Sequence, residues 1–213
     1  MAMGFLESAV VIYLRKLYYP EGFDFPVKSM SSIILHTELL REAATIIMIL
    51  AVAWLSGKNL LTRFGWFLFV FGIWDLFYYL FLKIMLEWPE SLMTWDLLFL
   101  IPIVWTGPVY APILNALSMI FLGWLLAGSQ HSLKLNNKIW LILITGAVLI
   151  FISYIYDYVV VCIQHKVSLS DCFSATTTNY IPLWFPWPVF ASGQLLVFIA
   201  IYQISKQLQT PFK

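Results

Sequence analysis

The stretch FGWFLFVFGIWDLFYYLFLKIML, residues 64–86, decides the fold class of this chain. A helix needs about 20 apolar residues to cross a bilayer, and this stretch supplies them with one acidic residue, Asp75, near its middle. Comparable apolar stretches recur along the chain, so the pattern is general. The sequence therefore predicts an all-α integral membrane protein, a single domain over residues 1–213 with a bundle of five transmembrane helices.

Composition supports the same conclusion. The 213 residues are 62% hydrophobic and 11% charged, with a formal net charge of +1, whereas soluble domains carry about 25% charged residues. This balance excludes a disordered chain, an ordinary soluble enzyme and a nucleic-acid binder driven by positive charge. We expect the lipid bilayer as the partner and no nucleic acid, and the sequence identifies no partner subunit.

The third predicted crossing differs from the others because prolines interrupt it. The segment 95–127 contains Pro102, Pro108 and Pro112, and its first apolar run, 97–104, is too short to span alone. We interpret it as a short half-helix, an irregular turn and a longer helix. The five spans are predicted at about 30–55, 64–86, 95–127, 139–163 and 184–204.

The N-terminal segment 5–19 is apolar but contains Glu7, Arg15 and Lys16, which favours an interfacial helix over a span. If it did cross, there would be six spans with both ends inside. Basic residues without acids occur in the loops between spans one and two, between spans three and four, and after span five. By the positive-inside rule these loops are cytoplasmic, which predicts a cell membrane protein, for example of a cell inner membrane, with the N-terminus outside and the C-terminus in the cytoplasm.

Charged residues within the predicted spans are costly, at roughly 2.5–3.5 kcal/mol each on insertion scales, so they need a reason. All the intramembrane acids fall between the midplane and the outer surface, and the inner half of the membrane has none. This distribution predicts an outward-facing polar pocket.

On span one, Glu38, Arg41 and Glu42 follow the spacing of three and four that places residues on one helix face. His36 lies about 160° away from Glu38 at 100° per residue. Arg41 is expected to pair with Glu38 or with Glu42, which leaves one carboxylate over.

We expect Glu42 and Asp75 to act as acid and base, Arg41 to orient or tune one of the two carboxylates, and His36 to be a second base or a metal ligand. A divalent metal held by His36, Glu42 and Asp75 is a variant, although no motif requires a cofactor. The expected ligand-binding residues are Glu38, Tyr79, Asp96, Asn115 and Asp157.

Three classes of function fit this pattern. The first is a membrane-embedded enzyme that uses carboxylate acid–base or metal chemistry on a lipidic or isoprenoid-like substrate. The second is a small transporter or receptor for a cation or a cationic ligand, which an interrupted helix favours. The third is a structural subunit of a larger membrane complex, in which the charges only pair with one another.

Overall fold

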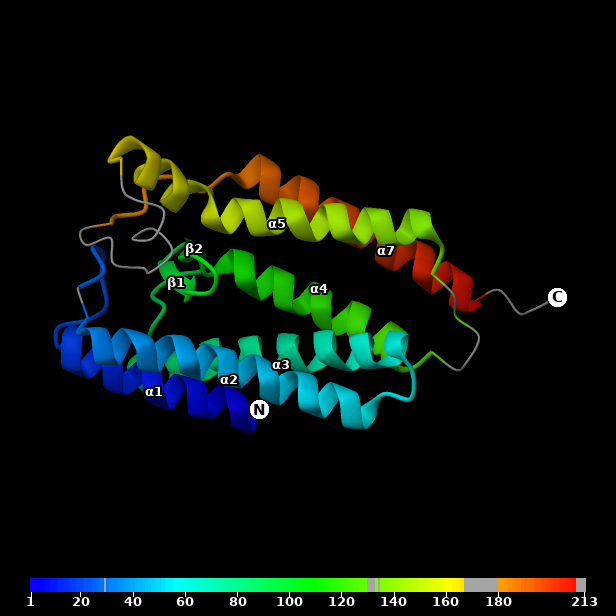
Figure 1. The fold of residues 1–213 in the computed structure, drawn as a ribbon, viewed down its shortest axis with the longest axis horizontal. Coiled ribbons are helices and arrows are strands. Elements are labelled where there is room, and N and C mark those ends of the chain that lie inside the picture. The colour runs from blue at the N-terminus through cyan, green and yellow to red at the C-terminus, as the bar shows by residue number, and fades with distance from the viewer. Residues whose placement is uncertain (29, 130–132, 134, 167–179, 210–213) are drawn as a thin grey trace.

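Long helices make up most of the chain in a computed structural model, which describes residues 1–28, 30–129, 133, 135–166 and 180–209. A short antiparallel hairpin lies between the third and fourth helices (Figure 1). In chain order the elements are α1 (Ala2–Tyr18), α2 (Ser32–Ser56), α3 (Leu60–Leu86), β1 (Trp95–Phe99), β2 (Trp105–Pro108), α4 (Tyr110–Ala127), α5 (Asn137–Gln164) and α7 (Trp187–Gln209).

Five of these helices, α2, α3, α4, α5 and α7, are long and apolar enough to cross a membrane by length and composition. They match the five predicted apolar stretches in number, and their bounds lie within a few residues of the prediction except in the third. Figure 1 shows them running side by side along the long axis of the molecule, with α5 and α7 as one pair and α1, α2 and α3 on the opposite side of α4.

Polar residues directly before three of these helices define where the helices begin. Asn59 and Thr62 form a reciprocal capping box, in which Thr62 N donates to Asn59 Oδ1 at 2.9 Å and Asn59 N donates to Thr62 Oγ1 at 3.1 Å. Asn136 Oδ1 accepts from Ile139 N at 2.9 Å at the start of α5, and Ser31 caps α2. Each cap satisfies an amide that the first helical turn leaves without a partner.

Glycines bring the backbones of neighbouring helices into direct contact. A Cβ atom on Gly123 of α4 would lie 2.5 Å from Phe69 N of α3, and one on Gly72 of α3 would lie 2.6 Å from Ala116 O of α4. Gly146 and Gly193 meet in the same way between α5 and α7. Small residues at such contacts are typical of helix packing in membranes, where close van der Waals contact replaces the hydrophobic effect.

The predicted half-helix at 97–104 is wrong, because the structure forms a β-hairpin there. Strand β1 pairs antiparallel with β2, with Trp95 opposite Pro108 and an irregularity between Leu97 and Phe99. The physical reason is hydrogen bonding. Pro102 cannot donate a hydrogen bond within a short helix, whereas the paired strands satisfy each other's backbone groups on either side of it.

The N-terminal helix also differs from the prediction. Instead of lying crosswise as an interfacial helix would, α1 runs lengthwise beside α3 (Figure 1). Its small residues permit this contact: a Cβ on Gly4 would lie 2.9 Å from Trp74 O, and Ser8 Oγ donates to Tyr78 O at 3.1 Å. Helix α1 therefore forms part of the bundle and brings its charged residues to the interior.

Candidate functional site

A cavity of about 250 Å³ lies among α1, α2, α3, the hairpin and residues of α4 and α5. Figure 1 places the hairpin near the end of the molecule where α2 begins and α3 ends, so the cavity occupies that half. Among its lining residues are five carboxylates and two guanidinium groups, namely Glu7, Glu38, Glu42, Asp75, Asp96, Arg15 and Arg41. Aromatic side chains form much of the remaining wall, among them Phe71, Trp74, Tyr78, Tyr79, Trp105 and Tyr154.

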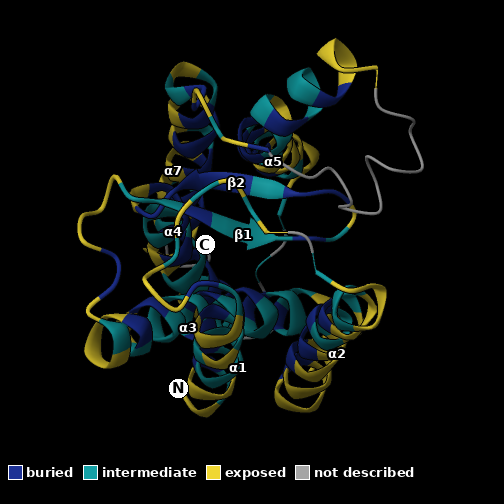
Figure 2. Cartoon of the chain, turned by 90° about the vertical axis from the view of Figure 1, so that its left-hand side faces the viewer, coloured by how far each residue is buried: buried dark blue, intermediate teal, exposed yellow. Residues whose placement is uncertain are grey.

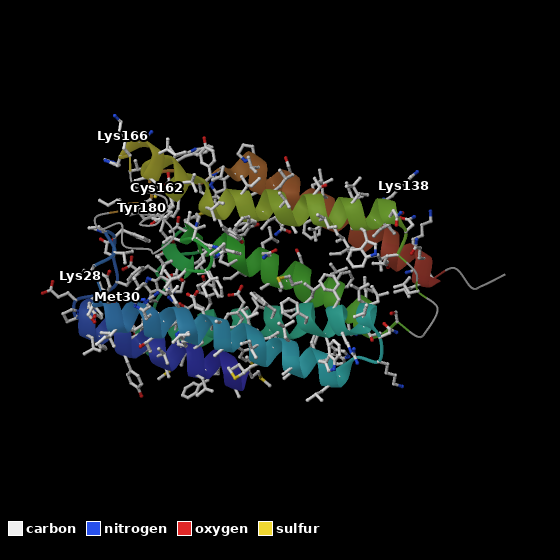
Figure 3. The ribbon with its side chains drawn as sticks, in the orientation of Figure 1. Lys28, Met30, Lys138, Cys162, Lys166 and Tyr180 are labelled. Atoms are coloured by element: carbon white, nitrogen blue, oxygen red, sulfur yellow. The ribbon has the colours of Figure 1, made fainter. Side chains whose placement is uncertain are left out.

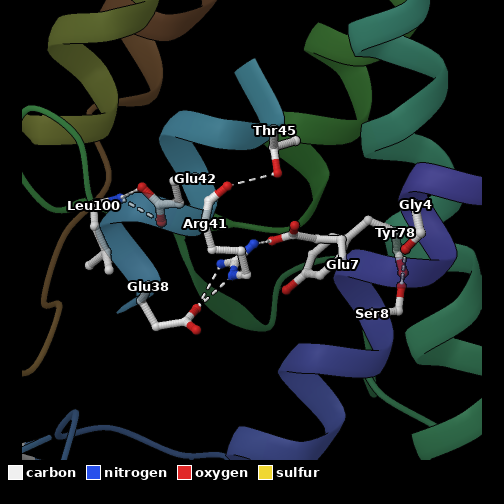
Figure 4. Close-up of polar contacts among 9 residues, drawn as sticks. All are labelled: Gly4, Glu7, Ser8, Glu38, Arg41, Glu42, Thr45, Tyr78 and Leu100. Carbon is white, nitrogen blue, oxygen red and sulfur yellow. Dashed lines mark hydrogen bonds and ion pairs between the residues drawn. The ribbon is translucent and has the colours of Figure 1, made fainter. Parts of the chain in front are cut away.

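Arg41 of α2 joins two carboxylates from different helices (Figure 4). Its Nε donates to Glu38 Oε2 at 2.8 Å, and its Nη1 donates to Glu7 Oε1 of α1. The pairing with Glu38 agrees with one of the two sequence alternatives. Glu7 was not among the residues predicted for the site, because α1 was expected at the membrane surface. The available signal was a single acid among the apolar residues of the first half of α1.

Glu42 lies one turn further along α2 and is buried. Both of its carboxylate oxygens accept from the backbone N–H of Leu100, at 3.1 and 3.0 Å (Figure 4). The Glu42 carboxylate is thus not bonded to Arg41, which was the other alternative. It instead fixes α2 to the segment that follows β1.

Asp96 of β1 is fully enclosed and has several partners. Its oxygens accept from Arg15 Nη2 of α1 at 3.1 Å, from Tyr79 OH of α3 at 3.1 Å, and from the Leu97 amide at 2.9 Å. Arg15 in turn places its guanidinium 3.7 Å from the centroid of the Trp88 ring. Burial raises the pKa of Asp96 to about 6, although Arg15, the Tyr79 hydroxyl and the Leu97 amide act to lower it. Arg15 was not among the residues predicted for the site.

Asp75 differs from the other cavity carboxylates. It lies on α3 and lines the cavity, and among the described residues its side chain forms no hydrogen bond or ion pair. Its side chain is only half-buried, because it faces the cavity space. Asp75 is therefore a carboxyl group for which this part of the chain supplies no partner.

Asn115 of α4 lines the cavity and also connects it to the neighbouring helix. Its Oδ1 accepts from Gln194 Nε2 of α7 at 3.4 Å, and Gln194 Oε1 accepts from Ser118 Oγ at 3.1 Å. Asn115 and Tyr79, both expected as ligand-binding residues, are thus placed at the cavity, each with a partner in the protein.

His36 and Asp157 are not brought to the cavity. His36 is exposed on α2, and its Nδ1 lies 2.6 Å from Ser32 O of its own helix. Asp157 accepts from Tyr180 OH at 2.8 Å and from the amides of Leu183 and Trp184 at 3.2 and 3.3 Å. It therefore attaches the segment before α7 to α5.

The expected metal site is not formed in the geometry of the described residues. His36 does not line the cavity that Glu42 and Asp75 share, and this part of the chain contains no group of three or more His, Cys, Asp or Glu side chains that could hold a metal ion. The three ligands of the expected divalent-metal site are thus not brought together. Glu42 and Asp75, the two carboxylates of the expected acid–base pair, both line the cavity.

Comparisons with known proteins find no match to this chain: no family model, no curated protein and no solved structure is similar to it. The function has to be inferred from the chemistry of the cavity itself.

Proposed function

We propose that the chain is an integral membrane protein whose five apolar helices cross a cell membrane, with the start of α2 on the outer side and the C-terminus in the cytoplasm. The outward faces of these helices support the first part, because large apolar side chains such as Ile47, Leu141 and Leu195 are each more than half exposed. Figure 2 shows exposed residues on the outer sides of α2, α5 and α7. Such surfaces suit lipid better than water.

We further propose that the cavity is the active site of a membrane-embedded enzyme. Asp75 transfers protons to and from a lipidic or isoprenoid-like substrate. The observation that carries this proposal is the Asp75 carboxyl, which faces the cavity without a partner among the described residues. An ionisable residue at membrane depth is costly and is by default a functional candidate.

Three ion pairs and one backbone hydrogen-bond contact, as in a structural subunit, account for the other four carboxylates but not for Asp75. Glu7 and Glu38 are held by Arg41, Asp96 is held by Arg15, and Glu42 is held by the Leu100 amide. A protein that needed charges only for assembly would gain nothing from a fifth carboxylate without a partner, since burying one has a cost in free energy.

Glu42 is the second proposed acid–base group, with its orientation fixed by Leu100. Arg41 contributes by holding Glu38 and Glu7, which reduces the negative charge near Glu42. The cavity volume of about 250 Å³ is slightly below the range of small-molecule pockets, ~300–1,000 Å³. We therefore expect the cavity to enclose one end of a lipidic substrate, with the rest extending beyond it.

This proposal is tested by incubating the purified protein in D₂O with lipids extracted from the source membrane, and by following deuterium in each lipid by mass spectrometry. Enzymatic proton transfer to carbon leaves a deuterium that persists after extraction. We expect at least one lipid to gain deuterium, and Asp75→Asn to lower that rate at least about 100-fold, which is the lower end of the contribution of general acid–base catalysis.

The matched control is Asp24→Asn, the same chemical change at an exposed aspartate outside the cavity, which should leave the rate unchanged. Absence of deuterium in every lipid with the folded wild-type protein would contradict the enzyme.

A second candidate is a receptor or transporter for a cationic ligand. The charge of the lining favours it, because five carboxylates and two guanidinium groups give a formal charge of −3. Aromatic faces and a free carboxylate are also the usual partners of organic cations. Uptake of a quaternary ammonium probe into sealed vesicles, abolished by Asp75→Asn, would favour this candidate over the enzyme.

A further inference from the structure

Polar atoms without partners gather around the cavity. Among the described residues, the buried side-chain nitrogen and oxygen atoms that lack a hydrogen bond are Trp74 Nε1, Trp105 Nε1, Tyr154 OH and Arg15 Nη1. All four belong to side chains that line the cavity. Because buried polar groups are nearly always hydrogen-bonded, this coincidence indicates a missing partner within the cavity.

The chemistry of these atoms defines what the partner must be. An indole N–H and a guanidinium N–H can only donate, and a tyrosine hydroxyl can donate as well as accept. The missing partner is therefore a hydrogen-bond acceptor. A cation has no lone pair to offer, and its positive charge would face the positive ends of these N–H bonds.

The same lining restricts the charge of the acceptor. The five carboxylates outnumber the two guanidinium groups, so the negative formal charge of the lining disfavours a phosphate or carboxylate ligand. A neutral oxygen remains. Two of the donors are neighbours, because the rings of Trp105 and Tyr154 are stacked with centroids 5.9 Å apart, and Trp74 lines the same cavity from α3. Trp74 and Tyr154 are 7% and 3% exposed, so these donors are shielded from bulk water.

We propose that the cavity binds a lipid ketone or related carbonyl compound, whose oxygen accepts from the N–H groups of Trp74 and Trp105 and from the hydroxyl of Tyr154. This inference rests on the proposed enzyme and names its substrate class. Proton abstraction beside a carbonyl requires a free carboxylate and N–H or O–H donors for the carbonyl oxygen, and this cavity is lined by both.

The reaction step is balanced without a cofactor. The Asp75 carboxylate removes a proton from the carbon adjacent to the carbonyl. The electron pair of that C–H bond becomes a C=C bond, and the carbonyl π electrons move to the oxygen, where the three donors stabilise the charge. Asp75 then returns the proton to the same carbon or, in an unsaturated ketone, to the far end of the conjugated system. The net reaction is hydrogen exchange or movement of a double bond.

The test uses the full chain in lipid nanodiscs with three probes of similar shape: the ketone geranylacetone, the hydrocarbon myrcene and the cation geranylamine. Binding is measured by saturation-transfer NMR. We expect the ketone to bind most tightly. Trp74→Phe and Trp105→Phe should each weaken its binding about 2- to 10-fold, the worth of one hydrogen bond, with no effect on myrcene. Trp124→Phe is the matched control, because Trp124 is 60% exposed on α4 and does not line the cavity.

A second measurement separates this inference from the enzyme on which it rests. Geranylacetone in D₂O should gain deuterium beside its carbonyl with the wild-type protein and not with Asp75→Asn. Ketone binding that depends on Trp74 and Trp105, without deuterium uptake, supports the carbonyl site and overturns the proton-transfer chemistry.

Tightest binding of geranylamine, or equal binding of ketone and hydrocarbon, overturns the carbonyl site, even where another lipid gains deuterium through Asp75. The order of binding affinity for the three probes is measured on the wild-type protein, so this test does not depend on whether a variant folds. If the tryptophan variants fail to fold, Tyr154→Phe removes a donor without changing the ring, and it should weaken the ketone alone.

Discussion

At the scale of single residues, Asp96 shows how burial and charge compete. The low-dielectric surroundings raise the pKa of its carboxyl to about 6, against the opposing effects of Arg15, Tyr79 and Leu97. Because the folded protein holds this proton more tightly than the unfolded chain, where the aspartate pKa is 3.8, the group stabilises the fold fully below about pH 4. That contribution is lost as the pH rises through 6, when Asp96 must ionise and depend on Arg15.

We predict that Arg15→Gln moves the titration of Asp96 to higher pH, since the guanidinium favours the ionised form. The carbonyl stretch of the protonated acid reports this by infrared titration, and the difference spectrum against Asp96→Asn isolates the band. In the wild-type protein the band should disappear as the pH rises, with a midpoint near pH 6. A midpoint that does not change in Arg15→Gln would show that the ion pair does not control this group.

At the scale of elements, the contact between α3 and α4 depends on the absence of side chains at Gly65, Gly72 and Gly123. We predict that Gly123→Ala destabilises the protein by about 1–3 kcal/mol, the usual effect of overpacking, because its methyl group would meet the backbone of Phe69 and Gly65 at 2.5 and 2.6 Å.

Thermal unfolding in detergent measures this effect, and Leu117→Ala on the exposed face of the same helix is the control that should change little. Equal stability of Gly123→Ala and the wild-type protein would mean that the two helices can separate without cost.

The elements also show what the sequence could and could not predict. The long apolar helices were predictable because each is a continuous apolar stretch that can be recognised from the sequence without tertiary contacts. The hairpin was not, since the pairing of Trp95–Phe99 with Trp105–Pro108 depends on tertiary contacts that a proline-rich segment does not reveal. The position of α1 was missed for a related reason: Glu7 and Arg15 favour the surface until their partners, Arg41 and Asp96, are known.

Within the site, periodicity was sufficient to place Glu38, Arg41 and Glu42 on one face and His36 on another. The free-energy cost of a carboxylate in the middle of an apolar helix was sufficient to select Asp75 as a candidate, because such a residue needs an explanation. The unpartnered Trp74, Trp105 and Tyr154 could not be selected, since aromatic residues are common in this chain and only the structure shows which donors lack an acceptor.

At the scale of the whole molecule, the proposed topology assigns the loops at the two ends of the long axis to opposite sides of the membrane. Figure 3 shows Lys28, Met30 and Lys166 at the end near the hairpin and Lys138 at the opposite end. We predict that a cysteine at exposed Glu90, after α3, is labelled by a membrane-impermeant maleimide in intact cells, whereas one at exposed Lys58, between α2 and α3, is labelled only after lysis. The native cysteines are first replaced, and the reverse labelling pattern would invert the proposed topology.

The hydrogen bonds from the Leu100 amide to the Glu42 carboxylate have a mechanical consequence. Helix α2 and the segment after β1 are joined at one carboxylate, so a tilt of α2 would move the hairpin with it. Asp96 lies on β1 and Arg41 lies on α2, so the two side chains would move together. A molecule that enters the cavity and tilts α2 would therefore also displace the hairpin, because both elements line the cavity.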